Sequence, residues 1–169
     1  PRLRQLMETL YRQVPTGLGG GGPLRLDRKE LDQVLRRGAP WAVERGYGQP
    51  SDLELTEEKG SIEGADSQAV GERPKTRGAS QLGTVGSGNH FVEVQAVTDI
   101  FDQDAAETMG ISEPGQVAVL IHCGSRGLGH QVCTDSLKII EAAGNRYGIK
   151  LLDRQLAAVP VNSPEGQQY

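Results

Sequence analysis

Two histidines lie where glycine-rich segments meet extended ones. His90 opens a segment of strand-like alternation, and His122 follows a nearly continuous apolar run over 116–121. Glycines let backbone N–H groups crowd toward an anion, and imidazole is a ligand for manganese, iron, cobalt, nickel and zinc. The shared glycine-rich context favours a single site that contains both side chains. The alternative is a pair of hydrogen-bonded structural histidines beside two tight turns.

The second glycine-rich segment, residues 124–129, follows a predicted strand and precedes a predicted helix. A turn in that position adds the dipole of a helix N-terminus to its backbone donors, and Arg126 could offer a bidentate fork to a phosphate. The spacing is neither the dinucleotide-binding G-x-G-x-x-G nor a P-loop, because no G-K-[ST] follows. His130, just after the glycines, would brace the turn by hydrogen bonding.

Two imidazoles alone do not complete a metal site. Cys123 is a poor third ligand beside His122, because neighbouring side chains of a strand point to opposite faces. Glu93 lies three residues after His90, which places its side chain on the opposite face unless the strand bulges. If a metal binds, we therefore expect further ligands from outside these 169 residues.

The first half of the chain is predicted to be largely helical and loop-rich. Apolar residues at helical spacing indicate an amphipathic helix over 3–14, and a glycine-rich loop follows at 15–23. Asp27 and Glu30 form a capping-box pattern for a second helix, which Gly38 ends. The other predictions in this half are a helical turn at 41–46 and a polar, loop-rich segment at 47–80 with a short helix near 67–72.

The second half predicts strands as well as helices. Residues 89–97 alternate between apolar and polar side chains, and 116–121 are apolar and β-branched enough for a strand buried on both faces. The other predicted elements are a helix at 102–109 that Gly110 ends, a helix at about 131–147 with Cys133, Leu137, Ile140 and Ala143 inward, strands at 149–152 and 157–161, and a helix that Ser163 and Pro164 begin. We therefore predict an α+β fold, with a mixed sheet and flanking helices.

Composition restricts the possible functions. With 22 acidic and 18 basic residues the formal charge is −4, which argues against wholesale electrostatic binding of nucleic acid. A local basic site stays possible at Arg73, Lys75 and Arg77, whose plainer interpretation is a solvated face. Two cysteines without a CxxC pattern indicate neither a disulfide framework nor a zinc finger. The sequence has no apolar run of membrane-spanning length, so we expect a cytoplasmic protein.

Two long segments carry a resemblance to a known family. One is LGTVGSGNHFVEVQ over 82–95, and the other is IHCGSRGLGHQV over 121–132. Together they resemble the two central signatures of the RtcB-type RNA-splicing ligases, and the likeness extends to segments at 46–48, 63–66, 77–82 and 163–169. The resemblance implies that residues 1–169 are the central part of one larger RtcB-like catalytic domain.

The resemblance also implies a chemistry. The family joins an RNA 3′-phosphate or 2′,3′-cyclic phosphate to a 5′-hydroxyl with GTP and Mn²⁺. A histidine attacks GTP, the guanylate passes to the RNA 3′-phosphate, and the 5′-hydroxyl then displaces GMP. Carried onto this sequence, His90 would ligate one of two Mn²⁺ ions and His122 the other. The remaining implied contacts are Asn89, His90, Phe91, Val92 and Glu93 for the guanylate, and Arg126 and Ser125 for phosphate or RNA.

Several features of the family are missing from these 169 residues. They are the upstream Asp-x-x-Cys segment, the downstream metal-binding histidine, the histidine that carries GMP and a C-terminal lysine that contacts guanine. We therefore expect no catalytic residue in this chain, and we expect the chain alone to bind Mn²⁺ and GTP poorly and not to ligate. The expected partners are RNA, such as tRNA exon halves or broken RNA, and an archease-type activator, with no DNA and no membrane.

Two other functions stay open at this point. One is a non-catalytic RNA- or metal-binding fragment or paralogue. The other is a different metal-dependent nucleotidyl or phosphoryl transferase that uses the same turns. Flanking sequence with an Asp-x-x-Cys segment and a histidine-rich half would separate the first from a ligase, and GTP-versus-ATP dependence would separate the second.

Overall fold

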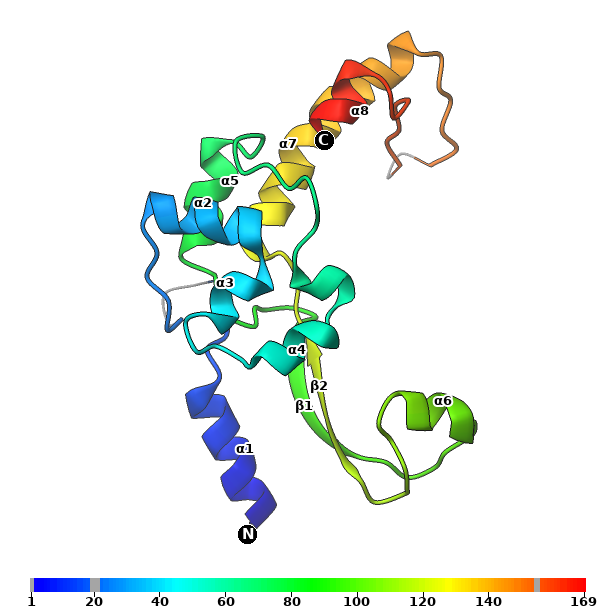
Figure 1. Cartoon of the computed structure of the whole chain (residues 1–169). Coiled ribbons are helices and arrows are strands. Elements are labelled where there is room, and N and C mark those ends of the chain that lie inside the picture. The colour runs from blue at the N-terminus through cyan, green and yellow to red at the C-terminus, as the bar shows by residue number, and fades with distance from the viewer. Residues whose placement is uncertain (1, 19–21, 154–155) are drawn as a thin grey trace. The chain divides into compact units, whose positions relative to one another are not determined.

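The chain forms two compact units, each built from two stretches of sequence. A computed structural model describes residues 2–18, 22–153 and 156–169. The first unit combines Pro1–Pro23 with Gly83–Gly124, and the second combines Leu24–Leu82 with Ser125–Tyr169. The first unit contains helices and one small sheet and the second contains helices (Figure 1), which confirms the predicted α+β class, and the sheet of the described residues is a single antiparallel pair. Among the described residues, no helix is both long and apolar enough to span a membrane.

A β-hairpin is the centre of the first unit. Strand β1 (Phe91–Ala96) pairs antiparallel with β2 (Val117–His122), and Phe91 lies opposite His122. Because directly opposed residues share a face, this register puts Phe91, Glu93 and Gln95 on the face of His122. The other face is aliphatic throughout; its members are Val92, Val94, Ala96, Val117, Val119 and Ile121.

The predicted burial of the second strand on both faces is wrong for the described structure. Val119 is 60% exposed and Ile121 is 62% exposed. A continuous apolar run predicts burial only if other elements cover it, and among the described residues β1 is the sole strand that pairs with β2. The apolar run therefore predicts strand β2 correctly but predicts its burial incorrectly.

Helix α1 (Arg2–Gln13) confirms the first predicted helix, and its following loop is tied to the glycine-rich turn before β1. Val85 donates its backbone N–H to the Pro15 carbonyl at 2.9 Å, and Gly17 donates to the Gly86 carbonyl at 2.7 Å. Of the loop predicted at 15–23, residues 19–21 lie outside the described residues. These two bonds fix where the chain enters the hairpin.

The connection between the strands contains helix α6 (Gln103–Thr108), as Figure 1 shows. Asp102 caps it by accepting from the Ala105 N–H at 3.0 Å. The turn after it is closed by Gln116, whose side chain accepts from the Ser112 N–H and donates to the Gly110 carbonyl. The prediction of a helix that Gly110 ends is confirmed.

The N-terminal helices of the second unit begin and end as their caps predict. In α2 (Arg28–Arg37), the Asp27 side chain accepts from the Glu30 N–H, and the Glu30 side chain accepts from the Asp27 N–H. Gly38 then separates α2 from α3 (Ala39–Val43). Trp41 is 1% exposed, and the Arg45 guanidinium lies 4.0 Å from the centre of its ring.

The segment 47–80 is more helical than predicted. It contains α4 (Pro50–Glu54), the 3-10 turn η1 (Glu57–Gly60) and α5 (Glu72–Ala79), whereas the expected helix near 67–72 is absent. The basic cluster on α5 is solvated only in part, because Arg73 and Arg77 are exposed whereas Lys75 is buried. Lys75 is 5% exposed, and its ammonium lies 2.8 Å from an Asp32 carboxylate oxygen on α2.

Helices α5 and α7 (Arg126–Arg146) pack against each other, and the contact depends on glycine. A Cβ atom on Gly78 would lie 2.6 Å from Cβ of Leu128. A Cβ atom on Gly127 would lie 3.0 Å from Cγ of Arg77. Helix α7 starts at Arg126 and not near 131, so that Gly127 and Gly129 lie inside it. Of these two glycines, Gly127 is the one that lets α5 approach.

The C-terminal part of the second unit is less regular than predicted. Ile140 and Ala143 are buried on α7 as expected, but Cys133 and Leu137 are exposed. The strands predicted at 149–152 and 157–161 are not formed in these described segments. Helix α8 (Pro164–Gln168) begins as predicted, with the Ser163 hydroxyl accepting from the Gly166 N–H at 3.0 Å.

Candidate functional site

The structure brings the two predicted histidines together. His90 immediately precedes β1, and His122 ends β2 opposite Phe91. Their ring centres are 5.9 Å apart, with an angle of 67° between the ring planes. The Phe91 ring packs edge-on against His122, 5.2 Å away. The hairpin register therefore places the two imidazoles beside each other, as the repeated glycine-rich context predicts.

The hydrogen bonding of His90 defines which of its nitrogens can bind a ligand. Nδ1 lies 2.9 Å from the Ser87 carbonyl oxygen, which can only accept, so Nδ1 carries the proton. The lone pair of Nε2 is then available, and a backbone carbonyl that fixes the tautomer in this way is a common outer partner of metal-binding histidines. A Cβ atom on Gly124 would lie 3.3 Å from Nε2, so glycine keeps the approach to that nitrogen open.

The site supplies imidazole donors but not a complete metal centre. The described residues contain no group of three or more histidine, cysteine, aspartate or glutamate side chains that could hold a metal ion. The Cys123 thiol is directed to backbone carbonyls instead, at 3.1 Å from that of Val85 and 3.6 Å from that of Thr84. The two imidazoles would therefore need further ligands to hold a divalent ion.

The residues around His90 that were predicted to line a guanylate site divide between the two faces of the strand. Val92 lies on the aliphatic face and, with His90 and Phe91, borders a cavity of about 200 Å³ that side chains of α1 also line. Glu93 lies on the face of His122 and accepts from the Gln95 side chain at 2.7 Å. Asn89 is exposed in the preceding turn.

Ser125 and Arg126, the predicted phosphate contacts, belong to the second unit. Ser125 is the N-cap residue of α7, and Arg126 is the first residue of that helix. Arg126 is half-buried and has a φ of 52°, an uncommon value for a residue with a side chain. The dipole of α7 favours an anion at this end, although the Gly127 N–H in the first turn already donates to the Gln81 side chain.

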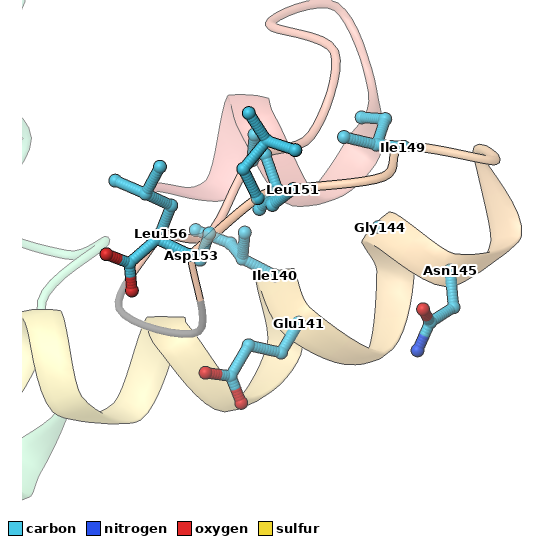
Figure 2. A pocket seen from close by; sticks show the side chains of 11 residues that line it. Ile140, Glu141, Gly144, Asn145, Ile149, Leu151, Asp153 and Leu156 are labelled. Carbon is cyan, nitrogen blue, oxygen red and sulfur yellow. The ribbon is translucent and has the colours of Figure 1, made fainter.

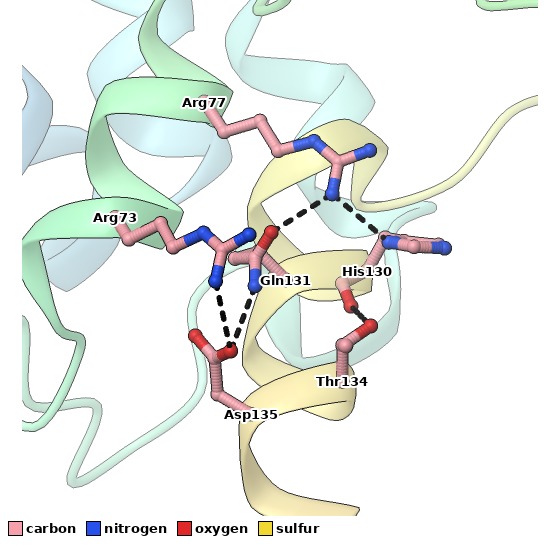
Figure 3. A network of polar contacts seen from close by, with 6 residues as sticks. All are labelled: Arg73, Arg77, His130, Gln131, Thr134 and Asp135. Atoms are coloured by element: carbon pink, nitrogen blue, oxygen red, sulfur yellow. Dashed lines mark hydrogen bonds and ion pairs between the residues drawn. The ribbon is translucent and has the colours of Figure 1, made fainter.

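A polar network that the sequence analysis missed joins α5 to α7 (Figure 3). Nη1 of Arg77 lies 3.2 Å from Nδ1 of His130 and 2.9 Å from Oε1 of Gln131. The Gln131 amide in turn donates to Asp135 at 2.8 Å, and the Arg73 guanidinium lies 3.8 Å from the same carboxylate. The expectation that His130 forms a bracing hydrogen bond is confirmed, but its partner is Arg77 on the neighbouring helix.

Two carboxylates outside these clusters are held in their charged form. The Lys75 ammonium donates to Asp32 and lowers its pKa, against a smaller opposing effect of burial. Hydrogen bonds from the backbone of Glu165 itself and from the Tyr147 hydroxyl, with the charge of Arg146, lower the pKa of Glu165. Both groups form ion pairs between helices and have no titration near neutral pH, so they are structural.

Comparison with known proteins decides the family. The family model described as tRNA-splicing ligase RtcB matches residues 1–169. The chain belongs to the RtcB family. Among curated RtcB relatives, the tRNA-splicing ligase RtcB of Archaeoglobus fulgidus is 53% identical over the whole chain, which covers 35% of that relative. Those of Aeropyrum pernix and Pyrococcus furiosus are each 54% identical over the whole chain, which covers 35% and 17% of them.

The chain thus covers between 17% and 35% of the length of these three RtcB relatives. This agrees with a donor set that is incomplete within the described residues.

A further cavity lies apart from these clusters, at the C-terminal end of α7 (Figure 2). It measures about 540 Å³, and aliphatic side chains such as Ile140, Leu151 and Leu156 line it together with the carboxylates of Glu141 and Asp153. Among the described residues, its lining includes no histidine, cysteine or basic side chain, and residues 154–155, which lie between Asp153 and Leu156, are outside the described part of the chain. We assign this cavity no function.

Proposed function

We propose that this chain acts within a GTP- and manganese-dependent RNA ligase, which joins an RNA 3′-phosphate or 2′,3′-cyclic phosphate to a 5′-hydroxyl. The observation that carries the proposal is the pair of imidazoles 5.9 Å apart in a chain that matches the RtcB model along its whole length. The relatives carry the name tRNA-splicing ligase, which supports RNA as the substrate, with tRNA exon halves or broken RNA as the forms considered.

In this proposal His90 and His122 each hold one Mn²⁺ ion, and residues outside the chain complete both coordination shells. Bound manganese would neutralise negative charge on the triphosphate and on the RNA phosphate. Ser87 contributes by keeping the proton of His90 on Nδ1, so that Nε2 can coordinate. Asn89, Phe91, Val92 and Glu93 would line the guanylate site around these histidines.

The proposed reaction has three transfers. A histidine outside this chain attacks the α-phosphorus of GTP and releases pyrophosphate. The guanylate then passes to the RNA 3′-phosphate, which for a 2′,3′-cyclic end first requires water to open the P–O2′ bond, and the 5′-hydroxyl attacks that phosphate and displaces GMP. Arg126 and Ser125, at the N-terminus of α7, would hold a phosphate in line during these steps.

The test is a joining assay on the full-length protein, with one RNA that ends in a 3′-phosphate and another that begins with a 5′-hydroxyl. We expect joined product only when both GTP and Mn²⁺ are present, and none from RNA with a 3′-hydroxyl and a 5′-phosphate. Joining that proceeds with ATP in place of GTP would indicate a different nucleotidyl transferase. No joining under any condition would favour a non-catalytic RNA- or metal-binding paralogue. We further propose a cytoplasmic location and an archease-type activator as partner.

A further inference from the structure

Arg77 is held at the first turns of α7 by contacts to both its stem and its guanidinium. A Cβ atom on Gly127 would lie only 3.0 Å from Cγ of Arg77. The aliphatic stem of Arg77 therefore packs against the backbone of α7 at Gly127. The Gln81 side chain, from the turn just after α5, accepts from the Gly127 N–H at 2.9 Å. His130 and Gln131 then both contact Nη1 of Arg77. The guanidinium therefore has a defined position beside α7 (Figure 3).

The direction of each hydrogen bond in this network follows from the chemistry of arginine. A guanidinium has only donors, so Nδ1 of His130 must accept and its proton must sit on Nε2. Gln131, which is 2% exposed, must likewise present its oxygen to Arg77 and its amide nitrogen to Asp135. At the other end of this network, the Asp135 carboxylate forms an ion pair with Arg73. The network thus has one consistent arrangement of protons, and neutral His130 is part of it.

The same contacts leave most of the Arg77 donors unused. The bonds to His130 and Gln131 engage Nη1 only, and no described residue accepts a hydrogen bond from Nε or Nη2. The Arg77 residue as a whole is exposed. Nε and Nη2 form one edge of the planar guanidinium, the edge that matches two oxygens of a phosphate.

We infer that His130 is a positioning residue, which holds the Arg77 guanidinium so that its Nε–Nη2 edge is presented to an RNA phosphate. The inference rests on the proposed function, because it takes RNA as the ligand. It gives His130 a role through Arg77 and no contact with RNA of its own. The important property of the side chain is then an acceptor at the Nδ1 position, and not its charge or ring.

Three substitutions separate that property from the rest of the side chain. His130→Asn keeps an acceptor oxygen at the Nδ1 position, His130→Gln moves the acceptor toward the Nε2 position, and His130→Ala removes it. Binding of a single-stranded RNA with a 3′-phosphate to the full-length protein is measured by fluorescence anisotropy at several salt concentrations. Losing one phosphate contact should reduce the slope of log K against log salt by about 0.7.

We expect Arg77→Ala, His130→Ala and His130→Gln each to weaken binding and to reduce the slope, and His130→Asn to restore both. In the Arg77→Ala background, His130→Ala should have no further effect, because the two residues act as one unit. Lys138→Ala, which removes a charge from an exposed position of α7, controls for net charge. A merely structural role for His130 would lower stability without changing the salt slope.

Two results would overturn the inference while the proposed function stands. One is wild-type RNA binding and joining with an unchanged slope in His130→Ala or Arg77→Ala. The other is an additive loss in the double variant, or an equal loss in His130→Asn and His130→Gln. A wild-type protein that neither binds nor joins RNA is a different outcome, which rejects the proposed function and the inference with it.

Discussion

Replacing Gly78 by alanine should destabilise the second unit, because the substitution puts a methyl group between α5 and α7. The new Cβ would lie 2.6 Å from Cβ and 3.3 Å from Cα of Leu128, and ordinary contact begins at 3.4 Å. Both atoms belong to the rigid part of α7, so the helices would have to separate by about 1 Å to reach ordinary contact.

Overpacking of this kind costs up to about 3 kcal/mol, and the better helix propensity of alanine offsets about 1 kcal/mol. We therefore expect Gly78→Ala to lower the free energy of unfolding by about 2 kcal/mol. The control is Thr76→Ala on the exposed side of the same helix, which should be neutral or slightly stabilising.

The assay is urea denaturation of the 169-residue chain, followed by the fluorescence of Trp41, its single tryptophan, which is buried in the same unit. A fall in the urea midpoint for Gly78→Ala, with none for Thr76→Ala, supports the close helix contact. A Gly78→Ala variant as stable as the wild type would refute it, and with it the packing that places Arg77 beside His130.

Two further predictions concern the ion pair of Lys75 and the completeness of the site. Because the folded state lowers the pKa of Asp32 below its usual 3.8, the stability from its pair with Lys75 is present at neutral pH and is lost as pH falls through the lowered value. Asp32→Asn should therefore lower the urea midpoint at pH 7, and the difference from wild type should shrink as the pH falls below 3.8; a difference independent of pH would contradict the pairing. The 169-residue chain alone should bind Mn²⁺ and GTP weakly and should not join RNA, because its described residues contain no cluster of three metal ligands; full joining activity from the isolated chain would contradict this.

Features encoded by neighbouring residues could be predicted from the sequence. The capping box of Asp27 and Glu30 and the cap of Ser163 depend on residues three apart, so their pattern alone indicates the helix starts. The meeting of His90 and His122 could also be predicted, because each histidine lies at the end of a strand beside a glycine-rich segment. The antiparallel register that brings them together was not evident from that pattern.

Features that depend on contacts between distant residues could not be predicted from the sequence. Arg77 and His130 are 53 positions apart, and nothing local distinguishes Arg77 from a solvated arginine. Lys75 is buried only because Asp32 arrives from another helix. The glycine-rich segment around Gly127 suggests a turn. In the structure, the missing side chain of Gly127 instead lets α5 lie close to α7. In each case the deciding contact comes from a part of the chain that a short window does not include.

The central claim is that His90 and His122 hold the manganese ions of an RNA ligase. The most direct measurement is Mn²⁺-dependent transfer of labelled guanylate from GTP to the full-length protein, for the wild type, His90→Ala and His122→Ala, with Cys133→Ser as an exposed control. We expect strong labelling of the wild type and of Cys133→Ser, and a loss of labelling in both histidine variants. Unchanged labelling in both histidine variants would contradict the assignment.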